Sequence, residues 1–323
     1  MKYISCISGL MLLAAYMPAA AQQTKLLTAE KHNEYGLVYT LPVTALDIEV
    51  TAVREVKKAG QYYQYAKKYV GTDKVVKEDD ESWTIEKVKV RPYGIPDPDA
   101  RYLMQLKPGA LAYIGVDADG MLLSINTPPV VEEVEKTAPR PVEGEKIADR
   151  EYLQYVDEDF IASQSSAKQA QMLAENLMEI REAKTSLTRG TAETMPTDGK
   201  QLELMLNSLA HQEAALTAAF LGNTTRETVV RNFTYVPADN GREVVFRMSD
   251  FDGFVAANDY SGEPVYIDIE ITNEGTLPVD AKGEEKKMPK DAVAYCVPGA
   301  ANVSLTYQGK KLFNKEFEMS QFG

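Results

Sequence analysis

The side chains that most often carry out catalysis or bind a transition metal are sparse in this chain of 323 residues. Its two histidines, His32 and His211, do not have the His-x-x-x-His spacing of a helical zinc site, and neither lies near a cysteine. Ser165 and Lys168 match the Ser-x-x-Lys motif of a lysine-activated serine, but the companion Ser-Asp-Asn and Lys-Thr-Gly motifs are absent from the sequence. We therefore interpret Ser165 as a helix N-cap and predict no catalytic residue and no cofactor. Carboxylates from separate loops could still form a glycosidase pair.

Two acidic turns offer oxygen ligands for Ca²⁺. Asp117 and Asp119 precede one glycine, and Asp250 and Asp252 precede another. An EF-hand loop needs a bidentate glutamate at its twelfth position, whereas the twelfth residue counted from Asp117 is Pro128. A hairpin turn explains the same residues, so a calcium-stabilised structural protein is the third hypothesis.

Three tyrosines share one face of a short helix predicted over residues 60–71, namely Tyr62, Tyr65 and Tyr69. An aromatic platform of this kind binds sugars, which makes a carbohydrate-binding module or a glycan-acting enzyme the second hypothesis. The alternative is a helix that packs its apolar face on a sheet and keeps its hydroxyl groups at the rim.

These side chains must be positioned by a long helical stretch and the β-type sequence around it. Apolar residues at three- and four-residue steps predict a helix over 166–189, which ends at Gly190 as a left-handed C-cap. Asp198 suits the N-cap of a second amphipathic helix, which ends at Gly222. Two amphipathic helices joined by a short loop are expected to pack antiparallel.

Alternating apolar and polar residues predict strands on both sides of the helices, for example over 264–272. Pro42 is expected to separate two strands, and the prolines of 94–99 predict an irregular loop. The predicted fold class is α+β, with two β-rich units flanking a long antiparallel helix hairpin. The predicted divisions are a signal peptide (1–21), an N-terminal β-rich domain with the short tyrosine-rich helix (22–127), a Pro/Glu-rich linker (128–150), the helix hairpin (151–222) and a C-terminal domain that resembles a β-sandwich (223–323).

The N-terminus has the features of a secretory signal peptide. Lys2 precedes an apolar run to Met17, and small residues lead to a predicted cleavage after Ala21. Cleavage leaves Cys296 as the one cysteine, so no intramolecular disulfide is expected. No second hydrophobic segment follows, so we expect no integral membrane segment after signal removal.

The chain is acidic, with 35 basic and 48 acidic residues and a net charge of −13. Nucleic acids and anionic membrane surfaces are bound by clustered lysine and arginine, so neither is an expected partner.

Six short segments stand out along the chain: the helix 60–71 with its Tyr-Gln-Tyr-Ala core, the loop 94–98, Met195-Pro-Thr-Asp-Gly, Phe220-Leu-Gly, Ser261-Gly-Glu-Pro-Val and the closing Gln321-Phe-Gly. As a set they resemble a "domain of unknown function" family of exported proteins from Bacteroidetes. The resemblance implies a Gram-negative envelope, hence the periplasm or the cell surface, and it brings no catalytic residues. The first hypothesis is therefore a non-enzymatic envelope component with a binding or structural role, whose partner is an envelope protein or a glycan.

Overall fold

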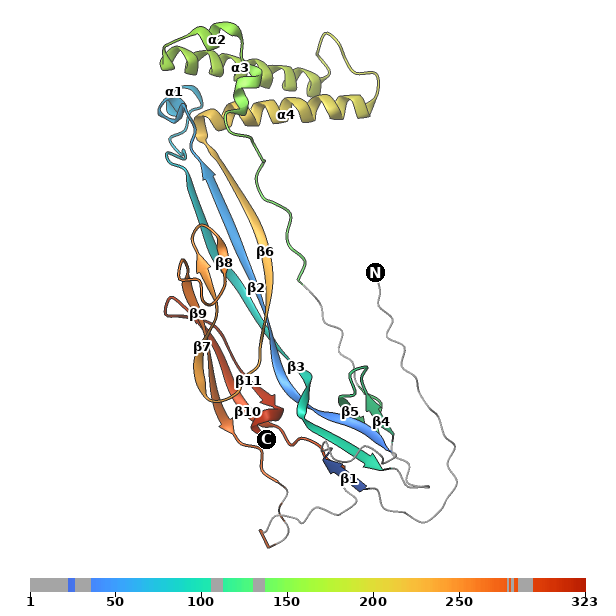
Figure 1. Ribbon diagram of the computed structural model, residues 1–323. Coiled ribbons are helices and arrows are strands. Elements are labelled where there is room, and N and C mark those ends of the chain that lie inside the picture. The colour runs from blue at the N-terminus through green and yellow to red at the C-terminus, as the bar shows by residue number, and fades with distance from the viewer. Residues whose placement is uncertain are drawn as a thin grey trace.

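The computed structural model describes residues 23–26, 36–105, 113–129, 137–277, 279, 282–283 and 293–323. It confirms a mixture of helices and antiparallel sheets, with the helices gathered at one end of a long sheet (Figure 1). No helix within these ranges is long and apolar enough to cross a membrane. The predicted signal peptide, His32 and residues 130–136 of the predicted linker lie outside the described residues.

The first sheet has four antiparallel strands in the order β1-β3-β2-β6. In β2 the even-numbered residues Ile48 and Val50 are fully buried on one face, whereas the odd-numbered Asp47 and Glu49 point to the opposite face. The four strands are β1 (Gln23–Leu26), β2 (Leu37–Lys58), β3 (Asp80–Gln105) and β6 (Asn223–Tyr235).

Two predicted breaks in these strands are wrong. β2 runs through Pro42, and β3 is a single strand through residues 94–99. The pairing of the two strands is irregular there, because Pro42 pairs with Pro96 and Thr40 with Arg101, which leaves residues 97–100 without a partner on β2. Proline is tolerated at bulges and on edge strands because no neighbouring strand needs its missing N–H. β1 pairs only with Tyr102–Gln105, so the preceding part of β3 is an edge among the described residues.

The second sheet has the strand order β11-β10-β9-β7-β8 and packs face to face on the first through one shared core. Ile48 and Val50 of β2 lie in that core with Ile267 and Val303 of the second sheet. Its strands are β7 (Gly241–Ser249), β8 (Gly253–Val255), β9 (Glu263–Asn273), β10 (Gly299–Tyr307) and β11 (Lys310–Met319), and the short helix η3 (Ser320–Phe322) follows them.

The strand β6 lies within the predicted C-terminal domain, but it pairs with β2 along its whole length. Phe233 of β6 stacks on Phe246 of β7, with ring centroids 4.3 Å apart. The C-terminal strands therefore share their core with N-terminal strands. A small hairpin of β4 (Ile114–Val116) and β5 (Leu122–Ile125) lies near the beginning of β2 (Figure 1).

The helices form a second core, and we call residues 60–71 and 151–221 the head. Leu173 and Leu177 pack there against Leu216 and Phe220, and all four side chains are fully buried. The head contains η1 (Tyr63–Tyr65), α1 (Ala66–Tyr69), η2 (Glu151–Tyr155), α2 (Glu158–Ala162), α3 (Ser166–Arg189) and α4 (Gly199–Leu221). The carboxylate of Asp198 accepts the N–H of Gln201 at the start of α4.

The head meets the sheet at a close approach of two glycine backbones. A Cβ atom on Gly60 would lie 2.8 Å from the nitrogen of Gly222, so a side chain there would separate the two segments. The backbone N–H groups of Tyr62 and Val76 donate to the carbonyls of Ala219 and Leu221, which caps the last turn of α4.

Residues 137–150 form an extended strap that runs from the sheet to the head (Figure 1). Thr137 donates to Glu49 through its hydroxyl (2.5 Å) and its N–H (3.3 Å). Glu143 exchanges two backbone hydrogen bonds with Arg226 of β6, each 2.9 Å. The predicted linker is thus fixed to the first sheet at both points.

Candidate functional site

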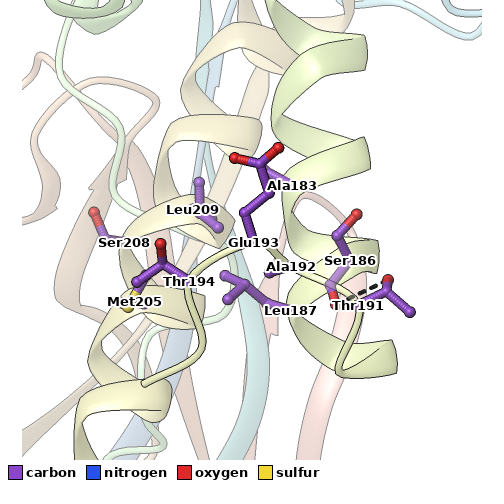
Figure 2. Close-up of a pocket in the computed structure, with 10 residues that line it drawn as sticks. All are labelled: Ala183, Ser186, Leu187, Thr191, Ala192, Glu193, Thr194, Met205, Ser208 and Leu209. Atoms are coloured by element: carbon purple, nitrogen blue, oxygen red, sulfur yellow. Dashed lines mark hydrogen bonds between the residues drawn. The ribbon is translucent and has the colours of Figure 1, made fainter. Parts of the chain in front are cut away.

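A groove lies at the end of the α3–α4 pair that is farthest from the sheets. It is a cavity of about 550 Å³ between the end of α3 and the first half of α4, bordered by the connecting loop. Figure 2 shows the side chains of Leu187 from α3 and of Met205 and Leu209 from α4 around the space between the helices. The full lining is Ala183, Ser186, Leu187, Thr191, Ala192, Glu193, Thr194, Met205, Ser208 and Leu209.

The groove has an apolar floor and a hydroxyl-bearing rim. Leu187 is buried, and Met205 is 39% exposed. Ser186, Thr191, Thr194 and Ser208 supply hydroxyl groups, and the hydroxyl of Thr191 donates to the carbonyl of Ser186 (3.5 Å). A cavity of this kind suits an apolar group with a few polar contacts at its edge.

The sequence analysis missed this groove, although α4 carries a signal for it. Leu202, Leu204, Met205, Leu206 and Leu209 are more apolar residues than one buried stripe needs. Leu204 is 63% exposed and Met195, in the connecting loop, is 40% exposed. Apolar residues on more than one side of α4 are therefore the sequence feature that indicates an exposed apolar surface on this helix.

The three predicted tyrosines do not form an exposed platform. Tyr62 is only 3% exposed, packs edge-on against Tyr152 and Phe160, and donates from its hydroxyl to Gln169 (3.1 Å). Burial raises the pKa of the Tyr62 hydroxyl. Tyr65 and Tyr69 are half-buried against the same core, and Lys68 lies over the Tyr69 ring at 4.6 Å.

The first predicted acidic turn joins β4 to β5, and its aspartate is engaged by the backbone. One carboxylate oxygen of Asp117 accepts the N–H groups of Asp119 and Met121, at 2.9 and 2.8 Å. Gly120 has a φ of +80°, which favours glycine. These bonds make Asp117 a turn-forming residue.

The second acidic turn lies between β7 and β8. The hydroxyl oxygen of Ser249 accepts the N–H groups of Phe251 and Asp252, both at 3.3 Å. Gly253 is required there because its φ is +70° and a Cβ atom would lie 2.7 Å from the Trp83 ring. The structure does not bring Asp250 and Asp252 together with Asp117 and Asp119, and the described residues contain no group of three or more potential metal ligands.

Ser165 of the Ser-x-x-Lys motif and His211 each make hydrogen bonds within the fold. The hydroxyl oxygen of Ser165 accepts the backbone N–H of Lys168 (3.4 Å), as expected of an N-cap. His211 contacts Glu145 and Glu151, two acidic residues that lie 66 and 60 positions away in sequence. Those two partners were not found by the sequence analysis, because nothing local connects them to His211.

The comparisons with known proteins identify a family and no activity. A family model described as a domain of unknown function, DUF4831, matches residues 35–323. No curated protein matches the chain significantly, and neither does any solved structure. The matched range includes every helix and strand of the described residues except β1. The chain belongs to the DUF4831 family.

Proposed function

We propose that this protein is a non-enzymatic, exported component of a Gram-negative envelope that binds a partner protein in the groove of the α3–α4 pair. The observation that supports it most is an apolar cavity of about 550 Å³ placed where the helices project beyond the sheets. The N-terminal sequence pattern and the resemblance to exported Bacteroidetes proteins support the location, in the periplasm or at the cell surface.

The position of the groove favours a macromolecular partner. In this proposal α3 and α4 act as an antiparallel hairpin that carries the groove away from the two packed sheets, which act as a β-sandwich (Figure 1). Exposed Leu204 and Met195 extend the apolar surface beyond the cavity itself. A protein that inserts an aliphatic side chain between Leu187 and Met205 would cover this surface and remove it from water.

The chemistry of the groove favours binding over catalysis. Its lining offers hydroxyl groups and one carboxylate, Glu193, but no histidine, lysine or cysteine that could activate a nucleophile. The hydroxyl groups can orient a partner's backbone at the rim. An aliphatic side chain in the floor and backbone contacts at the edge are the expected mode of recognition.

The test compares envelopes that contain the tagged wild-type protein with envelopes that contain a groove variant. After chemical crosslinking and solubilisation, we expect a discrete partner band with the wild type and its loss with Met205→Glu. The control is Ile161→Glu on α2, where the side chain is 68% exposed and outside the groove. Absence of any reproducible band, or a band that survives Met205→Glu, would refute the proposal. Osmotic release and protease protection of the tagged protein test its location.

A further inference from the structure

His211 is held between two carboxylates. Its Nδ1 lies 2.5 Å from Oε1 of Glu145, and its Nε2 lies 2.5 Å from Oε1 of Glu151. A neutral imidazole has one N–H donor and one lone pair, whereas a protonated ring donates through both nitrogens. Because an ionised carboxylate only accepts, satisfying both contacts requires the protonated ring.

The three residues come from three different parts of the chain. His211 lies in the middle of α4, Glu145 lies in the strap, and Glu151 is the first residue of η2. The carbonyl of Glu145 also accepts the side-chain N–H of Asn223, the first residue of β6 (2.9 Å). His211 therefore joins the upper end of the strap to the helix that leads into the sheet.

Among the residues that the structure describes, the groups around His211 are acidic or neutral. The ring contacts Glu145 from the strap and Glu151 from η2, and Tyr155 of η2 interacts with these two carboxylates. On the side of α4 that faces α3, Glu213 pairs with the basic side chains of Arg181 (2.8 Å) and Lys184 (3.1 Å). Loss of the ring proton would leave two carboxylates around a neutral imidazole.

The two carboxylates are not held equally. The side chain of Glu151 is 10% exposed, and its second oxygen accepts the N–H of Ala148 at 2.7 Å. The side chain of Glu145 is 45% exposed, and among the described residues His211 is the one group that forms a side-chain hydrogen bond or ion pair with it. When one of the two contacts is lost, Glu145 is therefore the one to leave.

We propose that His211 is a proton-operated clamp: the protonated ring fastens the strap to α4, and the neutral ring keeps Glu151 and releases Glu145. The hydrogen bonds to Glu145 and then Glu151 raise the pKa of His211 above its ordinary value, against the opposing effect of burial. The N–H of Ala148 lowers the pKa of Glu151, which keeps that carboxylate ionised when the ring changes charge.

The clamp lies beside a cavity of about 400 Å³ at the junction of head and sheet, and Glu151 is one of the residues that line it. Residues 147–152 form one wall of this cavity, and Lys58, Gln61, Ala215 and Asn223 lie among its other walls. Residues 147–150 of this wall lie between the two carboxylates of the clamp, and Glu151 is itself one of them. Its position therefore depends on the charge of His211.

The first measurement is an NMR titration of the histidine ring protons, in which the His211 signal is identified by its loss in His211→Gln. We expect the titration midpoint of His211 to lie above that of an unperturbed histidine and to fall in Glu145→Gln. Glu203→Gln is the matched control, because this exposed glutamate lies on the same helix and has no partner among the described residues. An unchanged midpoint in Glu145→Gln would overturn the proposal.

The second measurement is hydrogen–deuterium exchange of peptides from the strap, corrected for intrinsic rates, at about pH 6 and about pH 8.5, on either side of the histidine range. We expect the exchange protection of residues 143–150 to fall about twofold to fivefold at the higher pH. This is about the change in an opening equilibrium that the loss of one partly exposed ion pair produces. Glu145→Gln should abolish this dependence on pH, and Glu203→Gln should retain it. Strap protection that is independent of pH across the measured His211 midpoint would also overturn the clamp.

Discussion

Substitution of Gly222 by alanine should weaken the junction between the head and the sheet. Gly222 ends α4 with φ +78° and ψ −178°, a combination that is essentially restricted to glycine. A Cβ atom at this position would overlap the carbonyl oxygen of Lys58 and lie 2.7 Å from Cβ of Val76. Both neighbours belong to the chain segments that join the head to the sheet, so neither can move without loss of the junction.

The expected loss of stability has two parts. Backbone strain at such a position costs about 1–3 kcal/mol, and forced overlap with packed neighbours costs about 1–3 kcal/mol more. Gly190 is the matched control, because it has a positive φ of +72° at the end of α3 and nothing within 4 Å of its added Cβ. Gly190→Ala should therefore lose only the conformational part, about 1–2 kcal/mol.

The assay is urea unfolding of both variants and the wild type, followed by two signals. Far-UV circular dichroism at the helix band reports mainly on the head, and the fluorescence of Trp83, the single tryptophan, reports on the contact between the two sheets. We expect a larger loss of unfolding free energy in Gly222→Ala than in Gly190→Ala. Equal losses in the two variants, or a smaller loss in Gly222→Ala, would refute the steric argument.

Three further predictions follow from buried or engaged side chains. Thr137→Val should lower the free energy of unfolding by about 1.5–3 kcal/mol, because it removes the hydroxyl that donates a hydrogen bond to the charged carboxylate of Glu49. The side chain of Glu49 is only 2% exposed, so water cannot replace that donor. An unfolding free energy equal to that of the wild type in chemical denaturation would contradict this prediction. Burial acts to raise the pKa of Glu213, but the hydrogen bonds from two basic side chains of α3 outweigh it and lower that pKa. Glu213 therefore stabilises the fold at pH values above the ordinary glutamate pKa, and this stabilisation is lost as the pH falls through its lowered folded pKa. Glu213→Gln should make the melting temperature depend less on pH in the acid range. A melting temperature that falls with acid as steeply in the variant as in the wild type would count against this. Added Ca²⁺ or chelator should leave the melting temperature unchanged, because Asp117 is already engaged by two backbone N–H groups; a rise with Ca²⁺ would show a metal site.

The ends of the long helices could be predicted from sequence because local chemistry sets them. The Asp198 carboxylate caps the N–H of Gln201 three residues later, and Gly190 adopts the left-handed backbone that follows α3. The continuation of β3 through residues 94–99 could not be predicted in this way. Whether Pro96 breaks a strand depends on which side of that strand has a neighbour, and a neighbour is not visible in a local pattern.

Long-range pairing limits prediction of the candidate sites in the same way. The alternation in β6 predicts a strand, but its register against β2, with Val229 opposite Ala52, joins residues far apart in the chain. Of the two partners of His211, Glu145 comes from the predicted linker and Glu151 from the start of the predicted helix hairpin, and nothing local connects either of them to His211. Asp117 shows the opposite case. Its turn could be predicted from the sequence because its carboxylate bonds only to residues within four positions, Asp119 and Met121.

The junction also has a mechanical consequence. The chain passes between head and sheet four times: after β2, before β3, through the strap and from α4 into β6. A hinge needs a few residues that absorb a rotation, and a head on a single linker would have one. Here all four connections would have to rotate together, while Gly60 and Gly222 hold their backbones in contact. A pull on the far end of α4 would therefore be carried as shear along the hydrogen-bonded ladder of β2, β3 and β6, so that load at the groove is transmitted over the length of the sheet.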